Sequence, residues 1–296
     1  MPISFFEHIV MRADAMPPGK RADIPEVPGD MLVECFTVQA AAFPMSGLAF
    51  SDAIPTAVIL GNPNGMATFR SGGREQVVVH AWLSAQYLEN VRIQLDDPGD
   101  ELLAIRFNPL YFNDISNIPA RLLRNGLVWS LQDILGGNSG IMLTDIARQC
   151  DVPGKLDVLS HLLTRNARHH AANHLLQEAI QLIKINKGNV QIEQLAISLN
   201  VSYKWLERNF LQLTGVSPKE FARQQRFLHT YFDILNQPEK DLLEIALNNA
   251  FYDQNHLSKE FKKFTGYSPA WFRKHHGLSQ NERYWSGKVK KAPESQ

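Results

Sequence analysis

The stretch NFLQLTGVSPKEF (residues 209–221) reappears 51 residues further along the chain as EFKKFTGYSPAWF (residues 260–272), and this repeat decides the fold of the C-terminal part. The positions that match are Leu206 and Leu257, Phe210 and Phe261, Leu213 and Phe264, Thr214-Gly215 and Thr265-Gly266, Ser217-Pro218 and Ser268-Pro269, and Phe221 and Phe272. Similar residue types at a constant spacing are the signature of an internal repeat. The two copies are therefore expected to share one architecture.

Each copy predicts an amphipathic helix that ends at a glycine and is followed at once by another helix. The apolar positions recur at the spacing of one helix face. They are Leu206, Phe210 and Leu213 in the first copy and Leu257, Phe261 and Phe264 in the second. Gly215 and Gly266 then favour the left-handed conformation that closes a helix. The Ser-Pro pair that follows starts a new helix, and Ser217 and Glu220 have the spacing of a capping box.

A shorter helix is predicted ahead of each amphipathic helix, over residues 192–199 and 242–249. The connections are short, with Asn200-Val201-Ser202 in the first copy and Ala250-Phe251-Tyr252-Asp253 in the second. Two helices joined by a tight turn, with the second helix packed on one side only, form a helix-turn-helix unit. The C-terminal part is therefore predicted to be all-α, with two such units.

At these residues the sequence resembles the DNA-binding domain of the AraC/XylS family of transcriptional regulators. The two units are IEQLAISLNVSYKWLERNFLQLTGVSPKEF (residues 192–221) and LLEIALNNAFYDQNHLSKEFKKFTGYSPAWFRK (residues 242–274). They carry the family's paired pattern, including the F-x-D-Q-x-x-L-S-x-x-F-K core and the closing G-x-S-P. The resemblance covers about residues 171–276, and we expect the DNA-binding domain to span residues 171–280.

The resemblance implies a sequence-specific regulator of transcription that places one recognition helix of each unit in the major groove of promoter DNA. A central helix from Ser217 to about Leu235 would join the units, with Phe221, Leu228, Tyr231, Phe232 and Leu235 facing inward. RNA polymerase is an expected partner. A small-molecule effector and a second copy of the chain are further partners that the N-terminal part would bind.

Both turns depart from the family pattern, which has a glycine where this chain has Asn200 and Ala250. Asparagine tolerates the left-handed conformation, whereas alanine there costs on the order of 1 kcal/mol. The second turn is therefore expected to be either strained or rearranged.

The first recognition helix presents a polar face that suits DNA. Lys204, Glu207, Arg208 and Leu211 lie opposite its apolar stripe, and Tyr203, Trp205, Asn209 and Gln212 lie on its flanks. The planar fork of Arg208 can donate to guanine O6 and N7 together, which discriminates between bases by roughly 1–3 kcal/mol, and Glu207 can accept from cytosine N4. Trp205 could instead pack at the edge of the core.

The second recognition helix presents a different set of side chains. Asn255, Ser258, Lys259 and Lys262 form its outer face, with Gln254, His256 and Lys263 beside them. Gln254 and Asn255 can read adenine, whereas lysines often contact only phosphate, which positions the protein without specifying sequence. We expect the first unit to read sequence more sharply, and His256 to be polar filler.

The N-terminal part carries strand signals followed by helical ones. Branched and apolar runs lie at residues 31–38, 56–60, 65–70, 75–83, 88–95 and 101–107. Turn sequences separate them, among them Gly61-Asn62-Pro63-Asn64-Gly65, Ser71-Gly72-Gly73-Arg74 and Asp97-Pro98-Gly99. From Pro109 to Asn166 the apolar period is helical, as at Ile141, Ile146, Leu156, Leu159 and Leu163. Residues 1–165 are therefore predicted to form an α+β domain, β-rich and compatible with a cupin-like fold, for effector binding, dimerisation or both.

The formal net charge of zero conceals an uneven distribution. Residues 1–170 contain 13 Lys and Arg against 18 Asp and Glu, and residues 171–296 contain 17 against 12, so the halves carry −5 and +5. A positive half suits an anionic partner but is also compatible with an ordinary surface. No apolar run approaches the roughly 20 residues that cross a bilayer. We expect a cytoplasmic protein without membrane contact, and a disordered tail over residues 286–296.

The histidines and cysteines of the N-terminal part, and its glycine pair, form no recognisable catalytic or metal site. His80 is the single histidine of the strand region, whereas a metal-dependent cupin needs several, so it is predicted to be a satisfied core or surface histidine. His169-His170 lies in a polar linker, and Gly72-Gly73 suits a hairpin turn. Cys35 and Cys150 are too few for a disulfide framework or a cysteine zinc site and suit small core residues or a redox sensor. We therefore expect no cofactor, metal or catalytic residue.

Two alternatives to a ligand-sensing regulator stay open. One is a metal-dependent, cupin-like enzyme with an appended DNA-binding module. The other is a regulator whose N-terminal domain binds no ligand and serves only protein contacts.

Overall fold

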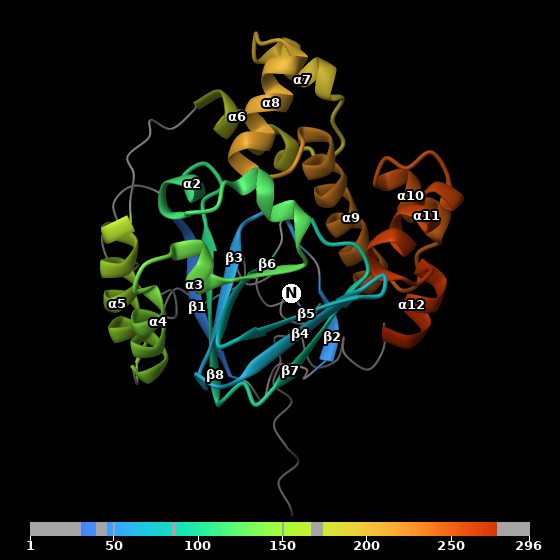
Figure 1. The fold of residues 1–296 in the computed structure, drawn as a ribbon. Helices are drawn as coiled ribbons and strands as arrows, with labels where there is room; N and C mark the ends of the chain where they lie inside the picture. The colour runs from blue at the N-terminus through green and yellow to red at the C-terminus, as the bar shows by residue number, and fades with distance from the viewer. Residues whose placement is uncertain are drawn as a thin grey trace, which may run out of the picture. The chain divides into compact units, whose positions relative to one another are not determined.

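The computed structural model describes residues 31–39, 46–49, 51–84, 87–149, 151–166 and 174–276 (Figure 1). Cys150, the His169-His170 pair and the tail from residue 286 lie outside these residues. The chain divides into two compact units that meet in sequence between Gln225 and Arg226. The predicted domain boundary near residues 165–171 borders a segment outside the described residues and stays a prediction.

The first unit contains two antiparallel sheets. The five-stranded sheet has the order β1 (Leu32–Gln39), β8 (Glu101–Phe107), β3 (Thr56–Leu60), β6 (Ala81–Ser84) and β9 (Val128–Ser130). The four-stranded sheet has the order β2 (Ser46–Ala49), β7 (Val91–Asp96), β4 (Met66–Ser71) and β5 (Arg74–Val79). Side chains alternate across each sheet, and Phe69 of β4 meets Trp82 of β6 edge to face, with ring centroids 5.8 Å apart.

Helices cover the other face of the five-stranded sheet. They are α2 (Phe112–Ile115), the 3₁₀ helix η2 (Ala120–Asn125), α3 (Leu131–Leu135), α4 (Ser139–Arg148) and α5 (Val152–Asn166). One hydrophobic core joins Ala81, Leu83 and Ile105 of the sheet to Ile146 and Leu159 of the helices. A β-rich region followed by helices is the predicted α+β class, which is confirmed.

The sequence prediction is wrong at three places in this region. The run Glu75–Leu83 was expected to be one strand, but His80 has a φ of 64° and divides it into β5 and β6, which belong to different sheets. The short strands β2 and β9 were not predicted, because SGLA and VWS carry too little strand signal. Ile141, one of the positions that indicated a helical period, lies in helix α4 as that period predicts, but its side chain is 66% exposed.

The hairpin between β4 and β5 follows the prediction. Ser71 pairs with Arg74, and Gly72 and Gly73 have φ values of 55° and 80°. Two successive residues with positive φ make the turn whose twist matches that of antiparallel strands, and glycine adopts it without a steric penalty.

The first helix-turn-helix unit also belongs to the first compact unit. It consists of α6 (His174–Ile185), α7 (Ile192–Ser198), α8 (Tyr203–Thr214) and the beginning of α9 (Pro218–Asn236). Its core contains Leu176, Leu206 and Phe210, and the same core includes Ala53 and Leu110 of the N-terminal region. Apolar contact with the N-terminal region thus explains why the compact unit ends as late as Gln225.

The second compact unit contains the rest of α9, α10 (Leu242–Asn248), α11 (Gln254–Thr265) and α12 (Pro269–His276). Its core is aromatic. The Phe227 ring stacks on Phe264 with centroids 4.3 Å apart, and Phe261 lies edge to face with Phe272 at 5.4 Å. The five residues of α9 expected to face inward are all buried: Phe221, Leu228, Tyr231, Phe232 and Leu235.

Among the described residues, no helix combines the length and apolar character needed to cross a lipid bilayer.

Candidate nucleic-acid interface

Both helix-turn-helix turns pass through a residue in the left-handed conformation. Asn200 has a φ of 54° and Ala250 a φ of 56°. In the first turn the backbone N–H of Val201 donates to Ala196 O over 3.0 Å. In the second turn the backbone N–H of Phe251 donates to Ala246 O over 2.9 Å, which is the equivalent hydrogen bond. The second turn has the backbone geometry of the first, so of the two outcomes expected for it the structure shows strain rather than rearrangement, because alanine adopts the left-handed conformation at a steric cost.

Side chains cap the N-terminus of each recognition helix. Ser202 Oγ accepts a hydrogen bond from the backbone N–H of Trp205 over 3.1 Å, and Asp253 Oδ1 accepts one from His256 over 2.7 Å. Each cap satisfies an amide that the first turn of a helix leaves without an intrahelical partner. The caps therefore fix where α8 and α11 begin.

The two copies also end their recognition helices with the same hydrogen bonds. Gly215 and Gly266 have φ values of 76° and 80°. Thr214 Oγ1 donates to Phe210 O over 2.7 Å and accepts from the backbone N–H of Val216 over 3.3 Å, and Thr265 makes the equivalent bonds in the second copy. The repeat seen in the sequence is therefore a repeat of hydrogen bonds.

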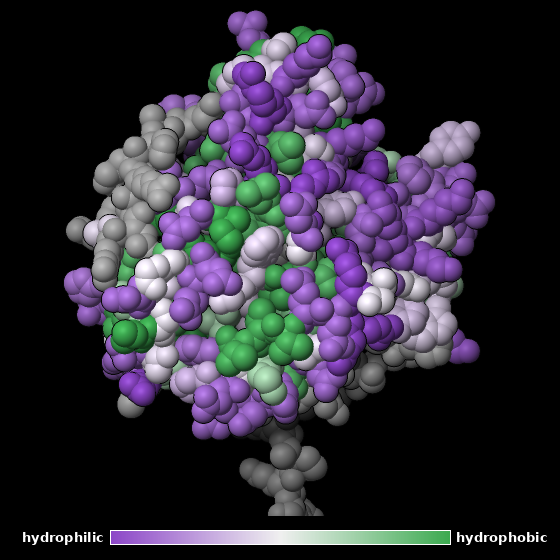
Figure 2. Space-filling model, viewed as in Figure 1, coloured by the Kyte–Doolittle hydropathy of each residue, from purple (hydrophilic) through white to green (hydrophobic). Residues whose placement is uncertain are grey.

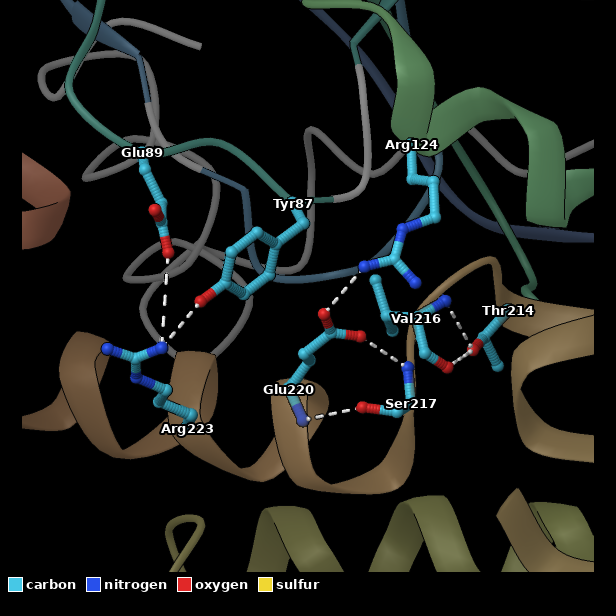
Figure 3. Close-up of polar contacts among 8 residues, drawn as sticks. All are labelled: Tyr87, Glu89, Arg124, Thr214, Val216, Ser217, Glu220 and Arg223. Carbon is cyan, nitrogen blue, oxygen red and sulfur yellow. Dashed lines mark hydrogen bonds and ion pairs between the residues drawn. The ribbon is translucent and has the colours of Figure 1, made fainter. Parts of the chain in front are cut away.

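The predicted capping box is present at the start of α9 (Figure 3). The backbone N–H of Glu220 donates to Ser217 Oγ over 3.2 Å, and the backbone N–H of Ser217 donates to Glu220 Oε2 over 2.8 Å. In the second copy, Ser268 Oγ accepts from the backbone N–H of Trp271 over 3.2 Å.

The structure places most of the predicted contacts of the first recognition helix on its solvent-facing side. Lys204, Glu207, Arg208 and Gln212 are exposed, and Trp205 and Asn209 are partly buried. Asn209 Nδ2 donates to Trp205 O within the helix over 2.7 Å, which occupies part of its hydrogen-bonding capacity. Beside them, desolvation and the carboxylates of Glu207 and Glu193 raise the pKa of Tyr203.

The second recognition helix has a longer exposed basic stretch. Gln254, Asn255, Lys259, Lys262 and Lys263 are exposed, whereas His256 and Ser258 are partly buried. The His256 ring lies edge to face with Phe251, with centroids 5.3 Å apart, as expected of a packing residue. Lys262 and Lys263 lie in the last turn, where cations also interact favourably with the helix dipole.

In the N-terminal region, His80 departs from its prediction. Its side chain is buried, but Nε2 has no hydrogen-bond partner among the described residues, so the imidazole is not satisfied. The described part of the chain contains no group of three His, Cys, Asp or Glu side chains that could hold a metal ion. Cys35 is buried in the core between sheet and helices.

Sequence reasoning missed a set of polar contacts between the N-terminal region and the first helix-turn-helix unit, within the first compact unit (Figure 3). Arg124 Nη2 of η2 donates to Glu220 Oε1 over 2.9 Å, and Arg223 Nη1 of α9 donates to the Tyr87 hydroxyl over 3.1 Å. Asn113 Nδ2 donates to Gln212 O, at the end of the recognition helix, over 3.1 Å. The partners in these three hydrogen bonds lie 96, 136 and 99 positions apart in the sequence, so no local pattern indicates them.

A buried charge pair lies in the same compact unit. Arg106 of β8 pairs with Asp52, and both side chains are at least nine-tenths buried. The backbone carbonyl of Asp52 also accepts from Gln225 Nε2 of α9 over 2.9 Å. Desolvation lowers the pKa of Lys184 in α6, an effect that Asp52 opposes and Arg106 reinforces.

Comparison with known proteins agrees with the duplicated units. A family model described as a helix-turn-helix domain matches residues 195–275. The Msm operon regulatory protein of Streptococcus mutans is 31% identical over 117 residues, which are 39% of this chain and 41% of that protein. The chain thus aligns with less than half the length of this relative.

Two groups of solved structures are similar in part. A transcriptional regulator from Chromobacterium violaceum, described as a protein with an AraC-type DNA-binding domain, is 23% identical, with a TM-score of 0.33 over 36% of this chain and 95% of that chain. ToxT from Vibrio cholerae, solved with an unsaturated fatty acid bound, is 13% identical, with a TM-score of 0.41 over 80% of this chain and 92% of that chain.

Proposed function

Because residues 195–275 form a helix-turn-helix domain of the AraC type, we propose that this protein regulates transcription by binding specific promoter sequences through both of its helix-turn-helix units. The observation that carries the proposal is the duplication of the helix-turn-helix unit. Each recognition helix has a side-chain cap at its N-terminus and the same hydrogen bonds at its C-terminus, and each presents an exposed polar face with different side chains.

Within this proposal, Arg208 is the main base reader. It is exposed in the middle of α8, where a guanidinium fork can reach guanine O6 and N7. Lys204, Trp205, Glu207, Asn209 and Gln212 complete the surface of the first unit. Gln254, Asn255, His256, Ser258, Lys259, Lys262 and Lys263 form that of the second, in which the lysines hold phosphates.

We assign residues 1–165 to effector sensing, dimerisation or both, and the proposal includes RNA polymerase as a partner and the cytoplasm as the location. It assigns no reaction to the chain. A stoichiometric metal ion in the purified protein would favour the alternative of an enzyme with an appended DNA-binding module.

The test is a salt titration of the full chain on duplex DNA that contains a selected high-affinity site. Lys and Arg displace condensed counterions from the phosphates, so the association constant should fall steeply as salt rises. Several phosphate contacts predict a loss of about 10³-fold or more between 50 and 200 mM salt. The absence of binding, or binding that does not depend on salt, would contradict the proposal.

A further inference from the structure

A cavity of about 540 Å³ lies in the first compact unit, between the corner that joins β5 to β6 and the start of α4. Ala81 and Leu143 line it, and both belong to the core that packs the helices on the five-stranded sheet. The cavity therefore lies on the helical side of this sheet and not between the two sheets. Val79 and Ile141, both more than half exposed, form apolar parts of its wall.

Apolar surface continues outside the cavity. Figure 2 shows hydrophobic residues gathered on the face of the molecule where Figure 1 places β4 and β5. Met66 and Val79 pair across these strands and are 37% and 54% exposed, and Val77 is 53% exposed. A ligand with an apolar side would therefore meet apolar surface at the mouth of the cavity.

Polar side chains also line the cavity. Ser130 and Asn138 stand at the N-cap positions of α3 and α4, but neither makes a capping hydrogen bond. Gln132, from the same wall, is exposed. A hydroxyl and two amides thus line one pocket, where such groups can donate to and accept from a bound molecule.

His80 adds a buried polar group to the same wall. It is 9% exposed, and its Nε2 has no hydrogen-bond partner among the described residues. A buried polar atom without a partner is uncommon in native structures, but Nε2 is itself closed to solvent, so it is not counted among the groups that would contact a ligand. Burial lowers the pKa of His80, so the imidazole is neutral near pH 7.

The described residues that line the cavity include no Asp, Glu, Lys or Arg. A charged ligand would find no counter-charge on these residues, so whatever part of its charge leaves water would not be compensated. Amide and hydroxyl groups together with apolar walls suit an uncharged molecule that carries hydroxyl or amide groups.

We propose that this cavity binds an uncharged small molecule with hydroxyl or amide groups, held by Ser130, Gln132 and Asn138 against Val79 and Ile141. That this ligand is the effector of the regulator rests on the proposed function. Binding itself does not, because it is measured without DNA.

Ligand-observed NMR on the full chain tests the proposal with two matched pairs of probes, glucose with glucuronate and nicotinamide with nicotinate. At least one neutral probe should bind, and its charged partner should bind at least tenfold more weakly. Ile141→Trp puts a bulky ring at the mouth of the cavity, and Asn138→Ala removes an amide that caps no helix. Both should weaken binding at least tenfold.

Arg148→Trp is the matched control, since Arg148 is an exposed residue of α4 that does not line the cavity and should leave binding unchanged. Circular dichroism verifies that each variant is folded. The proposal is overturned if neither neutral probe binds, if the charged partners bind equally well, or if binding survives in folded Ile141→Trp and Asn138→Ala. Loss of DNA binding alone would contradict the proposed function and leave this result intact.

Discussion

In the proposed function, Arg208 is the residue on which sequence discrimination by the first unit depends. Arg208→Ala should relax the base preference at one position of the site by roughly 1–3 kcal/mol, because it removes a bidentate contact to guanine. Lys263→Ala should weaken binding to all sequences about equally and lower the salt slope by roughly one, because a phosphate contact is lost. Competition binding with single-base variants of the site measures both effects. If both substitutions weaken binding to all sequences by the same factor, Arg208 is not a base reader.

Ala250 stores backbone strain in the second turn. Ala250→Gly should stabilise the folded protein by up to about 1 kcal/mol, because glycine removes the steric cost of a positive φ while its extra freedom in the unfolded chain offsets part of the gain. Asn200→Gly is the control, and it should change stability less because asparagine already tolerates this conformation. Denaturant unfolding provides the comparison. An equal or larger gain at Asn200 would argue against strain at Ala250.

His80 should make stability depend on pH. Its pKa is lowered in the folded state from the ordinary value of 6.5, so the unfolded chain takes up a proton first as pH falls. The stabilising effect of the neutral imidazole is complete above pH 6.5 and is lost as pH falls toward the lower folded pKa, by at most about 1.4 kcal/mol per pH unit. Denaturant unfolding of the native protein and His80→Asn between pH 7.5 and 5.5 should show a smaller slope in the variant. Equal slopes would contradict this account of His80.

At the scale of elements, Glu220 serves two contacts at the start of α9. It caps Ser217 N and pairs with Arg124 of the N-terminal region. Glu220→Ala should cost about 1–2 kcal/mol, since a cap bond is worth about 1 kcal/mol and a partly exposed ion pair about 0.2–1 kcal/mol. Glu220→Gln retains the cap and Arg124→Ala removes only the pair, so each should cost less. Urea unfolding of the three variants checks the order, and a loss for Glu220→Gln as large as that for Glu220→Ala would contradict the assigned cap.

The helices of the C-terminal part were predictable because their signals are local. Gly215, Ser217 and Glu220 lie within six residues of one another and act through the backbone of their own turn. The break at His80 was not predictable, because Glu75–Leu83 is rich in strand formers and nothing in that run requires a positive φ. Only the pairing of β5 with β4 and of β6 with β3 explains it.

At the scale of the whole molecule, the two recognition helices were predictable from the repeat. The contacts that join the N-terminal region to the first helix-turn-helix unit were not. The exposed faces of α8 and α11 follow from helical periodicity alone. The contacts of Arg124 with Glu220 and of Tyr87 with Arg223 join residues 96 and 136 positions apart, so they depend on tertiary packing that no sequence window contains. The cavity beside His80 likewise arises from packing between a strand corner and a distant helix.

The central claim is that two unlike recognition helices in one chain read one asymmetric site. A two-fold dimer of single units reads a palindrome, whereas tandem units with different faces cannot read the same bases. The most direct measurement is selection of the full chain on randomised duplex DNA, followed by footprinting of the selected sites. The site should contain two unlike segments with centres about 10 base pairs apart on one face of the duplex. Arg208→Ala should alter the preference in one segment only, and Asn255→Ala in the other only. A palindromic minimal site in which both substitutions alter the same positions would contradict the account.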